Sequence, residues 1–511
     1  MSKSYFDCMR EITKEELLES LLGYGMFAEK IPPIFTSEPL YDYCNANGYS
    51  WLDNEAHSAI SYENMRNISI PRILSIPYPA TYVNQCKFIS DNWDDIQQHF
   101  LKKTGCETFK KSQIHIRKMQ DKKELFEMNY KDFDSKYGLL EPEISIGAKY
   151  VVKADISNCF PSIYTHAISW ALAGIEEAKK NQKDSSKWYN KLDSCTRALK
   201  DNETHGVLIG PHSSNLISEI ILVAVDNELQ QYKYTRCIDD YTCFVPSQQE
   251  AEKFLIDLAN ALKKYDLSLN HKKTEILKLP LSSVESWVTV LKSFEIPDEI
   301  GVTFLRKYLD TAIYLANKTS NIAVINFVIK TLSTKNFKPL ALEYYINTIH
   351  NLLLLFPYLL PIVEDNVFIP LNINAKKIEK IANDIYKDGY QYNRFEAMSY
   401  AIYFAIKYNF KLGNDLFEKV KLKEDCIFMM LAYLHDVKFL TGIKQQYKDI
   451  AKEIQNDYLS KDKFWLFIYE VLPKEDIKDT CLKALKGKSG KNSCKKVSFI
   501  KKYSNKSNSY T

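Results

Sequence analysis

The chain has 511 residues, of which 45% are hydrophobic and 26% are charged, and its net charge is +4. This length and composition predict an ordinary globular protein of two or three domains. The longest apolar run, residues 352–363, contains two prolines and is too short to span a bilayer, and the mixed-charge N-terminus excludes a signal peptide. The cysteines form no CxxC pair, which argues against a disulfide framework or a structural zinc site, so we expect a cytoplasmic protein.

The positive charge is concentrated at the C-terminus. Residues 486–511 hold eight lysines and no acidic residue, which leaves the rest of the chain slightly negative. This composition predicts a basic, disordered tail. Such a tail is either a solvated end or an electrostatic footprint for phosphate groups.

The rest of the chain divides into three stretches that differ in predicted secondary structure. Residues 1–145 combine a helical N-terminus with an extended, proline-punctuated piece at 68–83. Residues 146–280 alternate strands and helices, expected as a strand at 148–156 and helices at 165–181, 213–232 and 250–267. From 281 to 485 the strand signals fade, and apolar helical segments follow one another with short polar joints. We therefore expect an α+β part followed by an all-α part of stacked helix pairs.

The segment CIDDYTCFV, residues 237–245, raises the first chemical question, because two adjacent aspartates separate two β-favouring runs. A tight turn made by Asp239 and Asp240 explains them structurally. A divalent cation that neutralises both carboxylates explains them chemically. Taken by itself, the segment favours the turn.

A third carboxylate, Asp155, ends the apolar strand predicted at 148–156. An acid at a strand end, beside a hairpin with two more acids, is the arrangement that a two-metal site needs, because the two ions share several carboxylates. Mg²⁺ takes oxygen ligands, so Asp is the expected residue type, and Cys or His is not. The alternative is that Asp155 caps a helix and has no chemical role.

A glycine-containing loop lies between these acids, in HGVLIGPHSSNLISEIIL at residues 205–222. Gly206 and Gly210 are followed by Pro211 and by a Ser/Asn cluster that starts a helix. Glycine lets the backbone approach a ligand closely, although an ordinary helix-start loop has the same composition.

The order of these pieces resembles that of the reverse transcriptase palm. KADISNCFPSIYTHAI is similar to the family's first palm motif, GVLIGPHSSNLISEI to its second, CIDDYTCFV to its Asp-Asp hairpin, and LSLNHKKTEIL to the lysine-containing strand and turn that follow. The resemblance implies N-terminal helices and fingers in 1–145, a palm in 146–280, and a helical-repeat domain in place of a thumb in 281–485. It also implies a nucleotidyltransferase that uses dNTPs and Mg²⁺ or Mn²⁺.

The resemblance gives roles to residues of the first and third motifs. Asp155 and Asp239 correspond to the two principal metal ligands, with Asp240 in support and Ile156 in the same metal-binding set. Phe160 resembles the steric gate, an aromatic ring that lies where a ribose 2′-hydroxyl would be and so favours deoxynucleotides.

The resemblance also implies contacts to the incoming nucleotide. Arg117 and Lys118 stand where the family's fingers offer cations to the triphosphate, and a planar guanidinium suits phosphate. Lys273 resembles the lysine near the leaving group, with Lys272 as its competitor, and Gly210 belongs to the nucleotide-binding loop.

Two departures from the family's pattern bear on templated copying. The hairpin begins with Cys237, where the family usually has an aromatic residue, and the second motif has Leu208-Ile209 where it usually has Pro-Gln. That glutamine normally helps to position nucleotide and template, and the side chain of Ile209 cannot form a hydrogen bond. The metal chemistry does not depend on either position.

These departures, with the long helical C-terminal part, make the chain resemble the abortive-infection (Abi) reverse transcriptases of bacterial phage defence. That family joins a reverse transcriptase-like domain to a HEAT-like helical-repeat domain. The resemblance implies untemplated DNA synthesis, in some members begun on a protein hydroxyl, so that single-stranded DNA stays covalently attached, and it implies homo-oligomers. The sequence leaves the priming hydroxyl unknown; Tyr5, Tyr503 and Tyr510 are expected to be able to move.

Two other interpretations stay open. An RNA-templated polymerase of the retron or intron type would need a basic thumb, for which the helical part gives no signal. A scaffold or sensor that binds nucleotide or a phage protein would use the helical repeats as its interaction surface. Such a scaffold has no need of three clustered carboxylates.

Overall fold

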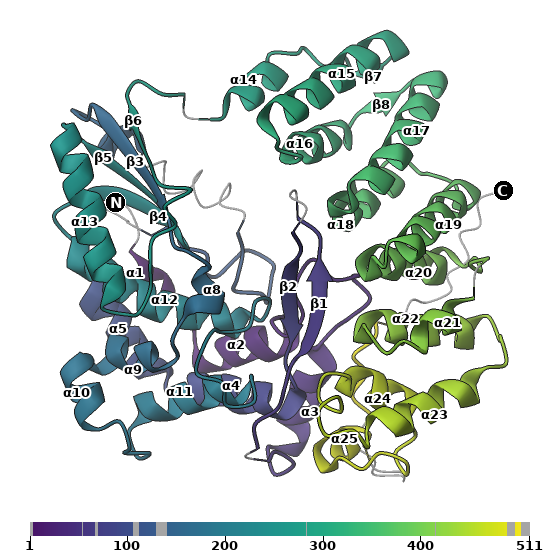
Figure 1. The fold of residues 1–511 in the computed structure, drawn as a ribbon, viewed down its shortest axis with the longest axis horizontal. Coiled ribbons are helices and arrows are strands. Elements are labelled where there is room, and N and C mark those ends of the chain that lie inside the picture. The colour runs from purple at the N-terminus through teal and green to yellow at the C-terminus, as the bar shows by residue number, and fades with distance from the viewer. Residues whose placement is uncertain are drawn as a thin grey trace.

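A four-stranded antiparallel sheet forms the centre of the α+β part (Figure 1). Its strands follow the order β4-β5-β3-β6, with bounds β3 (Tyr150–Asp155), β4 (Lys233–Cys237), β5 (Asp240–Val245) and β6 (Glu275–Lys278). The structure is a computed structural model that describes residues 4–53, 55–66, 70–105, 112–128, 141–282, 284–413, 415–487 and 496–501. The strand predicted at 148–156 and the predicted hairpin are both present.

Helix α13 (Gln248–Lys263) covers one face of this sheet, where it packs on β3 and β5. Its buried residues Ala251, Phe254, Leu258 and Leu262 recur every three or four positions, which is the spacing of one helix face. Helix α12 (His212–Asp226) is buried along nearly its whole length.

Two predicted helices are shorter than the sequence indicated. The helix expected at 165–181 is broken into α9 (His166–Ala173) and α10 (Ile175–Lys180), because Gly174 adopts φ +88°, a conformation that glycine reaches without strain. The helix expected at 213–232 ends at Asp226 and continues as one 3₁₀ turn.

A second, two-stranded sheet stands between the four-stranded sheet and the C-terminal helices (Figure 1). It is a hairpin of β1 (Ile60–Asn64) and β2 (Arg72–Ile76). Around it and the sheet lie helices α1 (Tyr5–Met9), α2 (Lys14–Glu19), α3 (Glu38–Asn47), α4 (Pro79–Asp91), α5 (Trp93–Thr104), α7 (Glu141–Ile144), α8 (Cys159–Ser162) and α11 (Trp188–Ala198).

The C-terminal part is almost entirely helical and curves around one side of the molecule (Figure 1). Its helices are α14 (Ser286–Lys292), α15 (Val302–Thr319), α16 (Ala323–Leu332), α17 (Pro339–Leu355), α18 (Leu360–Val363), α19 (Ala375–Gln391), α20 (Phe395–Tyr408), α21 (Leu416–Val420), α22 (Cys426–Lys438), α23 (Lys444–Ile454), α24 (Trp465–Val471) and α25 (Thr480–Leu485). Two short strands, β7 (Glu299–Ile300) and β8 (Asn336–Phe337), pair within it.

The β1–β2 hairpin is fastened to this helical part by one buried carboxylate. Glu396, on α20, is 2% exposed and accepts hydrogen bonds from the Asn64 side chain at 2.5 Å and from the Met65 backbone N–H at 2.7 Å. Burial raises the pKa of Glu396 to about 8. The end of β1 is therefore held by a group that ionises near neutral pH.

No single helix among the described residues is long and apolar enough to cross a membrane. The pair Pro339–Leu355 and Pro357–Phe368, bent by 119°, meets the length and composition required of a broken span.

Part of the basic tail is ordered, although the sequence predicts a disordered segment. Within 496–501, the Phe499 ring is fully buried and packs against Trp465, with ring centroids 5.1 Å apart. The backbone carbonyl of Phe499 also accepts the Thr36 N–H at 2.9 Å. Val497 and Phe499 are apolar residues between lysines, and burying them outweighs the cost of ordering this short segment.

Candidate active site

The first and third motifs meet at the edge where β3 and β5 pair. In the register of these strands, Asp155 is the partner of Asp240, and Cys237 is the partner of Asp240 on the other side. Asp239 stands in the adjoining turn, where its carbonyl accepts the backbone N–H of Ile156 at 3.1 Å. The fold thus brings together the three aspartates that the sequence places 84 and 85 positions apart.

The turn of the hairpin is one residue earlier than the sequence suggested. It consists of Ile238 and Asp239, and Asp240 is already the first residue of β5. Ile238 has φ +55°, in the left-handed region that a β-branched residue rarely enters. Such a conformation costs on the order of 1–3 kcal/mol and persists only where surrounding contacts fix it.

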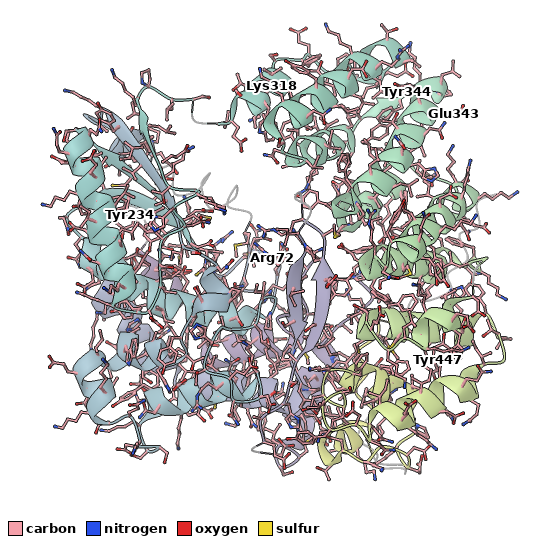
Figure 2. All side chains as sticks on the ribbon, viewed as in Figure 1. Arg72, Tyr234, Lys318, Glu343, Tyr344 and Tyr447 are labelled. Atoms are coloured by element: carbon pink, nitrogen blue, oxygen red, sulfur yellow. The ribbon has the colours of Figure 1, made fainter. Side chains whose placement is uncertain are left out.

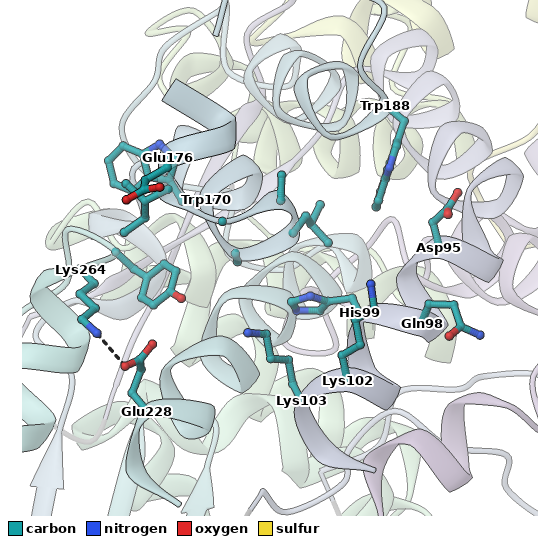
Figure 3. Close-up of a pocket in the computed structure, with 16 residues that line it drawn as sticks. Asp95, Gln98, His99, Lys102, Lys103, Trp170, Glu176, Trp188, Glu228 and Lys264 are labelled. Atoms are coloured by element: carbon teal, nitrogen blue, oxygen red, sulfur yellow. Dashed lines mark hydrogen bonds and ion pairs between the residues drawn. The ribbon is translucent and has the colours of Figure 1, made fainter. Parts of the chain in front are cut away.

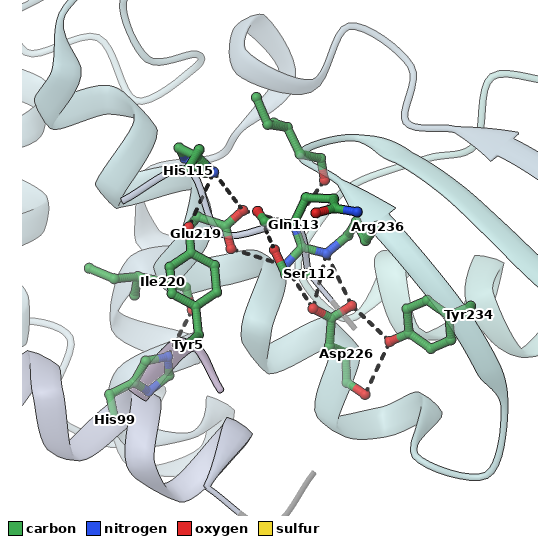
Figure 4. A network of polar contacts seen from close by, with 11 residues as sticks. Tyr5, His99, Ser112, Gln113, His115, Glu219, Ile220, Asp226, Tyr234 and Arg236 are labelled. Carbon is green, nitrogen blue, oxygen red and sulfur yellow. Dashed lines mark hydrogen bonds and ion pairs between the residues drawn. The ribbon is translucent and has the colours of Figure 1, made fainter. Parts of the chain in front are cut away.

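Arg236 supplies one of those contacts (Figure 4). Its Nη1 donates to the Ile238 carbonyl at 2.9 Å, although the side chain is completely buried. The guanidinium is neutralised by two carboxylates of α12: Glu219, bound through Nη1 and Nη2 at 2.9 and 3.0 Å, and Asp226, reached at 2.7 Å. The strained turn therefore rests on a buried charged network.

This network was not anticipated from the sequence. Three charged residues lie in runs that are otherwise apolar or β-favouring, and Glu219 and Asp226 interrupt a buried helix. Lys, Glu, Arg and Asp are almost never fully buried unless paired, so an acid inside so apolar a helix indicates a buried partner. The sequence does not say which cation that partner is.

Asp155 is held by the loop that follows α13. Lys273 Nζ lies 2.6 Å from one carboxylate oxygen, and the Asn270 side chain donates to the other at 3.0 Å. The Asn270 backbone N–H also donates to the Asp155 carbonyl at 2.8 Å. The lysine-containing turn predicted from residues 267–277 thus contacts the first motif directly.

The charges at the site explain the behaviour of the hairpin acids. Burial and the Asp155 carboxylate raise the pKa of Asp239, against the opposing effect of Lys273 and Arg72. Burial, Asp239 and Asp155 raise the pKa of Asp240 to about 6. The three carboxylates thus carry more negative charge than the nearby cations neutralise, and a bound cation would relieve this excess of negative charge.

The comparisons with known proteins agree with these motifs. The profile of the family described as "Reverse transcriptase (RNA-dependent DNA polymerase)" matches residues 81–326, just under half of the chain. The chain contains a reverse transcriptase domain. This is a nucleotidyltransferase domain, and polymerases of the family act on nucleotides and nucleic acids and generally use divalent metal.

Two solved structures that resemble the chain are telomerases. Apo telomerase from Candida tropicalis, truncated from its C-terminal domain, is 14% identical with a TM-score of 0.28 and covers 45% of this chain; the chain spans 51% of its length. The longer apo telomerase from Candida tropicalis is 12% identical with a TM-score of 0.30, covering 83% of this chain and 75% of its own. No curated protein matches the chain.

The donor set of the reverse transcriptase domain fits a divalent cation by its chemistry, since it consists of carboxylate oxygens. Across the described ranges, no group of three or more His, Cys, Asp or Glu side chains is drawn together closely enough to hold a metal. Lys273 and Asn270 occupy both oxygens of Asp155, so that carboxylate must exchange a partner before it binds a cation. Ile156, the residue predicted beside Asp155, is buried and bound to Asp239 through its N–H.

The glycine loop packs against the β1–β2 hairpin. The Ile209 carbonyl accepts the Ser75 N–H of β2 at 2.8 Å. Gly210 has φ +129°, and a Cβ there would lie 3.1 Å from the Ser75 carbonyl oxygen and from Ala28 Cβ. Gly210 is therefore needed for backbone packing, and its predicted nucleotide contact stays a prediction.

Phe160 lies in α8, just after Asp155 in the chain. Its ring is half-buried against the core, and its carbonyl accepts the Val207 N–H of the glycine loop at 2.9 Å. This contact joins the first motif to the second. The steric-gate role of Phe160 stays a prediction.

The predicted triphosphate cations are engaged elsewhere. Arg117 is buried, and its Nη1 donates to the carbonyls of Ile114 and Glu127 at 2.6 and 2.9 Å. Lys118 pairs with Glu16 at 2.7 Å on the surface. Both side chains are thus bound to groups outside the aspartate site.

Arg72 is a cation that the sequence reasoning missed. It starts β2, is exposed, and interacts electrostatically with Asp239. Figure 2 shows it on the side of the hairpin nearer the four-stranded sheet. Its position in the proline-punctuated piece at 68–83 was the available signal, because an Arg between apolar residues marks an exposed strand position.

The tyrosines considered as priming residues differ in accessibility. Tyr5 is 2% exposed, and its hydroxyl is 3.1 Å from His115 Nδ1 in the network of Figure 4, so it cannot move freely as the sequence suggested. Tyr503 and Tyr510 lie outside the described residues.

Proposed function

We propose that the chain is a DNA polymerase of bacterial abortive infection that makes DNA from dNTPs without copying a template. It would act in the cytoplasm as a homo-oligomer, and its single-stranded product would begin on a protein hydroxyl. One observation carries the polymerase assignment: Asp155 and Asp240 are register partners, with Asp239 in the adjoining turn.

The reaction joins a hydroxyl oxygen to the α-phosphorus of a dNTP and breaks the bond to pyrophosphate, which leaves. Asp155, Asp239 and Asp240 would hold Mg²⁺ or Mn²⁺, which activates the attacking hydroxyl and neutralises the triphosphate. Arg72 supplies a fork of donors for the phosphates, and Lys273, once released from Asp155, supplies a charge for the leaving group.

Two features support untemplated synthesis. Ile209 offers no polar side chain, and its carbonyl is already bonded to Ser75. Helices α14 to α25 follow the palm, and they fit the HEAT-like repeats of the Abi reverse transcriptases better than a basic thumb. The helical region would contact neighbouring subunits or the product strand.

The direct test is incorporation without nucleic acid. The purified protein is incubated with Mg²⁺ or Mn²⁺ and labelled dNTPs, and a denaturing protein gel is run before and after nuclease. Label above the protein that collapses onto it after nuclease is the expected result. The control is Asp239→Asn with Asp240→Asn, which keeps shape and removes charge; incorporation by this variant would refute the metal assignment.

The second candidate is RNA-templated synthesis, which the description of the matching family as RNA-dependent favours. A primed RNA template is added in a parallel reaction. Activity that requires this template, with a product whose sequence follows it, would establish this candidate in place of the first. A free labelled smear without template would retain untemplated synthesis and remove self-priming.

A further inference from the structure

A cavity of 640 Å³, shown in Figure 3, lies outside the aspartate site. It is bounded by α5, by the junction of α9 and α10, and by the residues that follow α13. None of the three aspartates, Arg72 or Lys273 lines it. Its volume is in the range of small-ligand sites.

Two tryptophans supply aromatic surface to this cavity. Trp170, on α9, and Trp188, at the start of α11, lie on its two sides, and both are half-buried (Figure 3). Lys179 lies over the ring of Trp170, 5.6 Å from its centroid, so Trp188 presents the freer face. Indole rings that are partly open to solvent stack on nucleobases.

Two lysines supply positive charge next to the rings. Lys102 and Lys103, in the last turn of α5, form no ion pair with any residue that the structure describes. The third lysine of the cavity, Lys264, is neutralised by Glu228 at 2.6 Å. The remaining acids, Asp95 and Glu176, stand at opposite ends of the cavity (Figure 3).

His99 presents an unused acceptor to the same space. Its ring is 6% exposed, and its Nε2 lies 2.8 Å from the Ile220 carbonyl, which can only accept, so Nε2 carries the hydrogen. Burial lowers the pKa of His99 to about 4, so Nδ1 is a bare acceptor at neutral pH. Among the hydrogen bonds of the described residues, the ring of His99 forms only the one through Nε2, so Nδ1 is available to accept a ligand N–H.

We propose that this cavity binds a nucleotide: the base stacks on Trp188 and donates an N–H to His99, and the phosphate lies at Lys102 and Lys103. Each standard base has an N–H on its pairing edge, and phosphate is the anion that two neighbouring lysines attract. The ligand is either a free nucleotide or the 5′-phosphorylated end of a strand. This site is separate from the aspartate site and does not depend on the proposed polymerase activity.

The test is equilibrium binding to the full chain in EDTA, where metal-dependent binding at the aspartates is suppressed. Titrations with dATP and with a 5′-phosphorylated ten-residue deoxyoligonucleotide are followed by tryptophan fluorescence and checked by calorimetry. We expect Lys102→Gln with Lys103→Gln to weaken binding at least tenfold, and Trp188→Leu to do the same. Trp188→Phe should bind nearly as wild type, because it keeps an aromatic face.

Two matched variants separate this site from others. Lys253 is an exposed lysine on α13 outside the cavity, so Lys253→Gln should leave the affinity for both probes unchanged. Arg72→Gln should also leave it unchanged. If dATP has the lower dissociation constant of the two probes, the ligand is a free nucleotide. If the oligonucleotide has the lower dissociation constant, the ligand is a strand end. The proposal is overturned if the wild type binds neither probe, if the double lysine variant binds like wild type, or if Arg72→Gln alone abolishes binding.

Discussion

Lys273 Nζ lies 2.6 Å from Oδ2 of Asp155, and this contact joins the loop after α13 to the first acid of the site. The aspartate side chain is 7% exposed and the lysine side chain 58%. The carboxylate is therefore fixed from inside, whereas the ammonium can move into solvent. A cation that binds this oxygen of Asp155 must displace the ammonium, which would then be free to approach the triphosphate of the proposed substrate.

Lys273→Met should consequently make metal binding easier. Without the competing ammonium, the thermal unfolding midpoint should rise more on adding Mg²⁺ or Mn²⁺ than it does in wild type. In EDTA the free energy of unfolding of the variant should fall by only about 0–1 kcal/mol, because the lysine is exposed. Differential scanning fluorimetry over a metal titration measures both effects. Equal metal-induced shifts in the two proteins would show that Lys273 does not compete with the ion.

Arg72→Gln should raise the KM for dNTPs roughly tenfold, because a charged hydrogen-bond donor contributes about 1.5–3 kcal/mol to binding an anion. Lys118→Gln is the matched control: it removes a cation from the surface pair with Glu16 and should leave KM unchanged. Steady-state incorporation with varied dNTP distinguishes the two. The opposite pattern would support the triphosphate contact predicted from the sequence at Arg117 and Lys118.

The positions of two of the acids could be predicted from the sequence because their context is local. Asp155 ends an apolar strand and Asp239 stands in the turn between two β-favouring runs, so their neighbours in the chain already indicate where they lie. The cations could not be assigned in the same way. Whether an arginine such as Arg117 faces a nucleotide or a pair of carbonyls depends on how distant segments pack, which no local pattern records.

The exact turn was missed for a related reason. Aspartate suits turns and isoleucine does not, so local preference places the turn at Asp239-Asp240. Instead, Ile238 takes φ +55°, because the buried Arg236 holds its carbonyl and pairing with β3 draws Asp240 into the strand. Tertiary contacts that override a local preference at this position indicate a functional constraint.

Phe160→Ala should raise ribonucleotide use, with kcat/KM for rNTPs increasing on the order of tenfold or more relative to dNTPs. The ring belongs to the first motif and is only half-buried, so its loss opens space rather than collapsing the core. Phe160→Tyr keeps the ring and should exclude ribonucleotides like wild type. Paired rNTP and dNTP incorporation assays measure the ratio; equal exclusion by the alanine variant would rule out the gate.

Glu396 should make stability depend on pH. Its folded pKa of about 8 lies above the value of 4.5 expected in the unfolded chain, so the folded state binds the extra proton between these values. Its contribution to stability is complete below about pH 4.5 and is lost as pH rises to about 8, at no more than about 1.4 kcal/mol per pH unit. The Gln side chain of Glu396→Gln cannot ionise. Between pH 5 and 8.5, urea unfolding should therefore show that the unfolding free energy of the variant rises relative to that of wild type. A constant difference between the two proteins would contradict the assignment.

The network around Arg236 should stabilise the fold and position the hairpin, and these roles can be separated. Arg236→Met leaves the buried carboxylates of Glu219 and Asp226 without the guanidinium that neutralises them, which should cost about 3–5 kcal/mol of unfolding free energy and abolish incorporation. Adding Glu219→Gln and Asp226→Asn removes the unpaired charges and should restore most of the stability.

The triple variant should still be slow, however, because nothing donates to the Ile238 carbonyl and the strained turn is free to relax. A displacement of Asp239 by about 1 Å lowers the rate on the order of 10²-fold. Urea unfolding and incorporation measured on the same preparations separate the two roles. If the triple variant recovers both stability and rate, the network serves the fold alone and Arg236 has no positioning role.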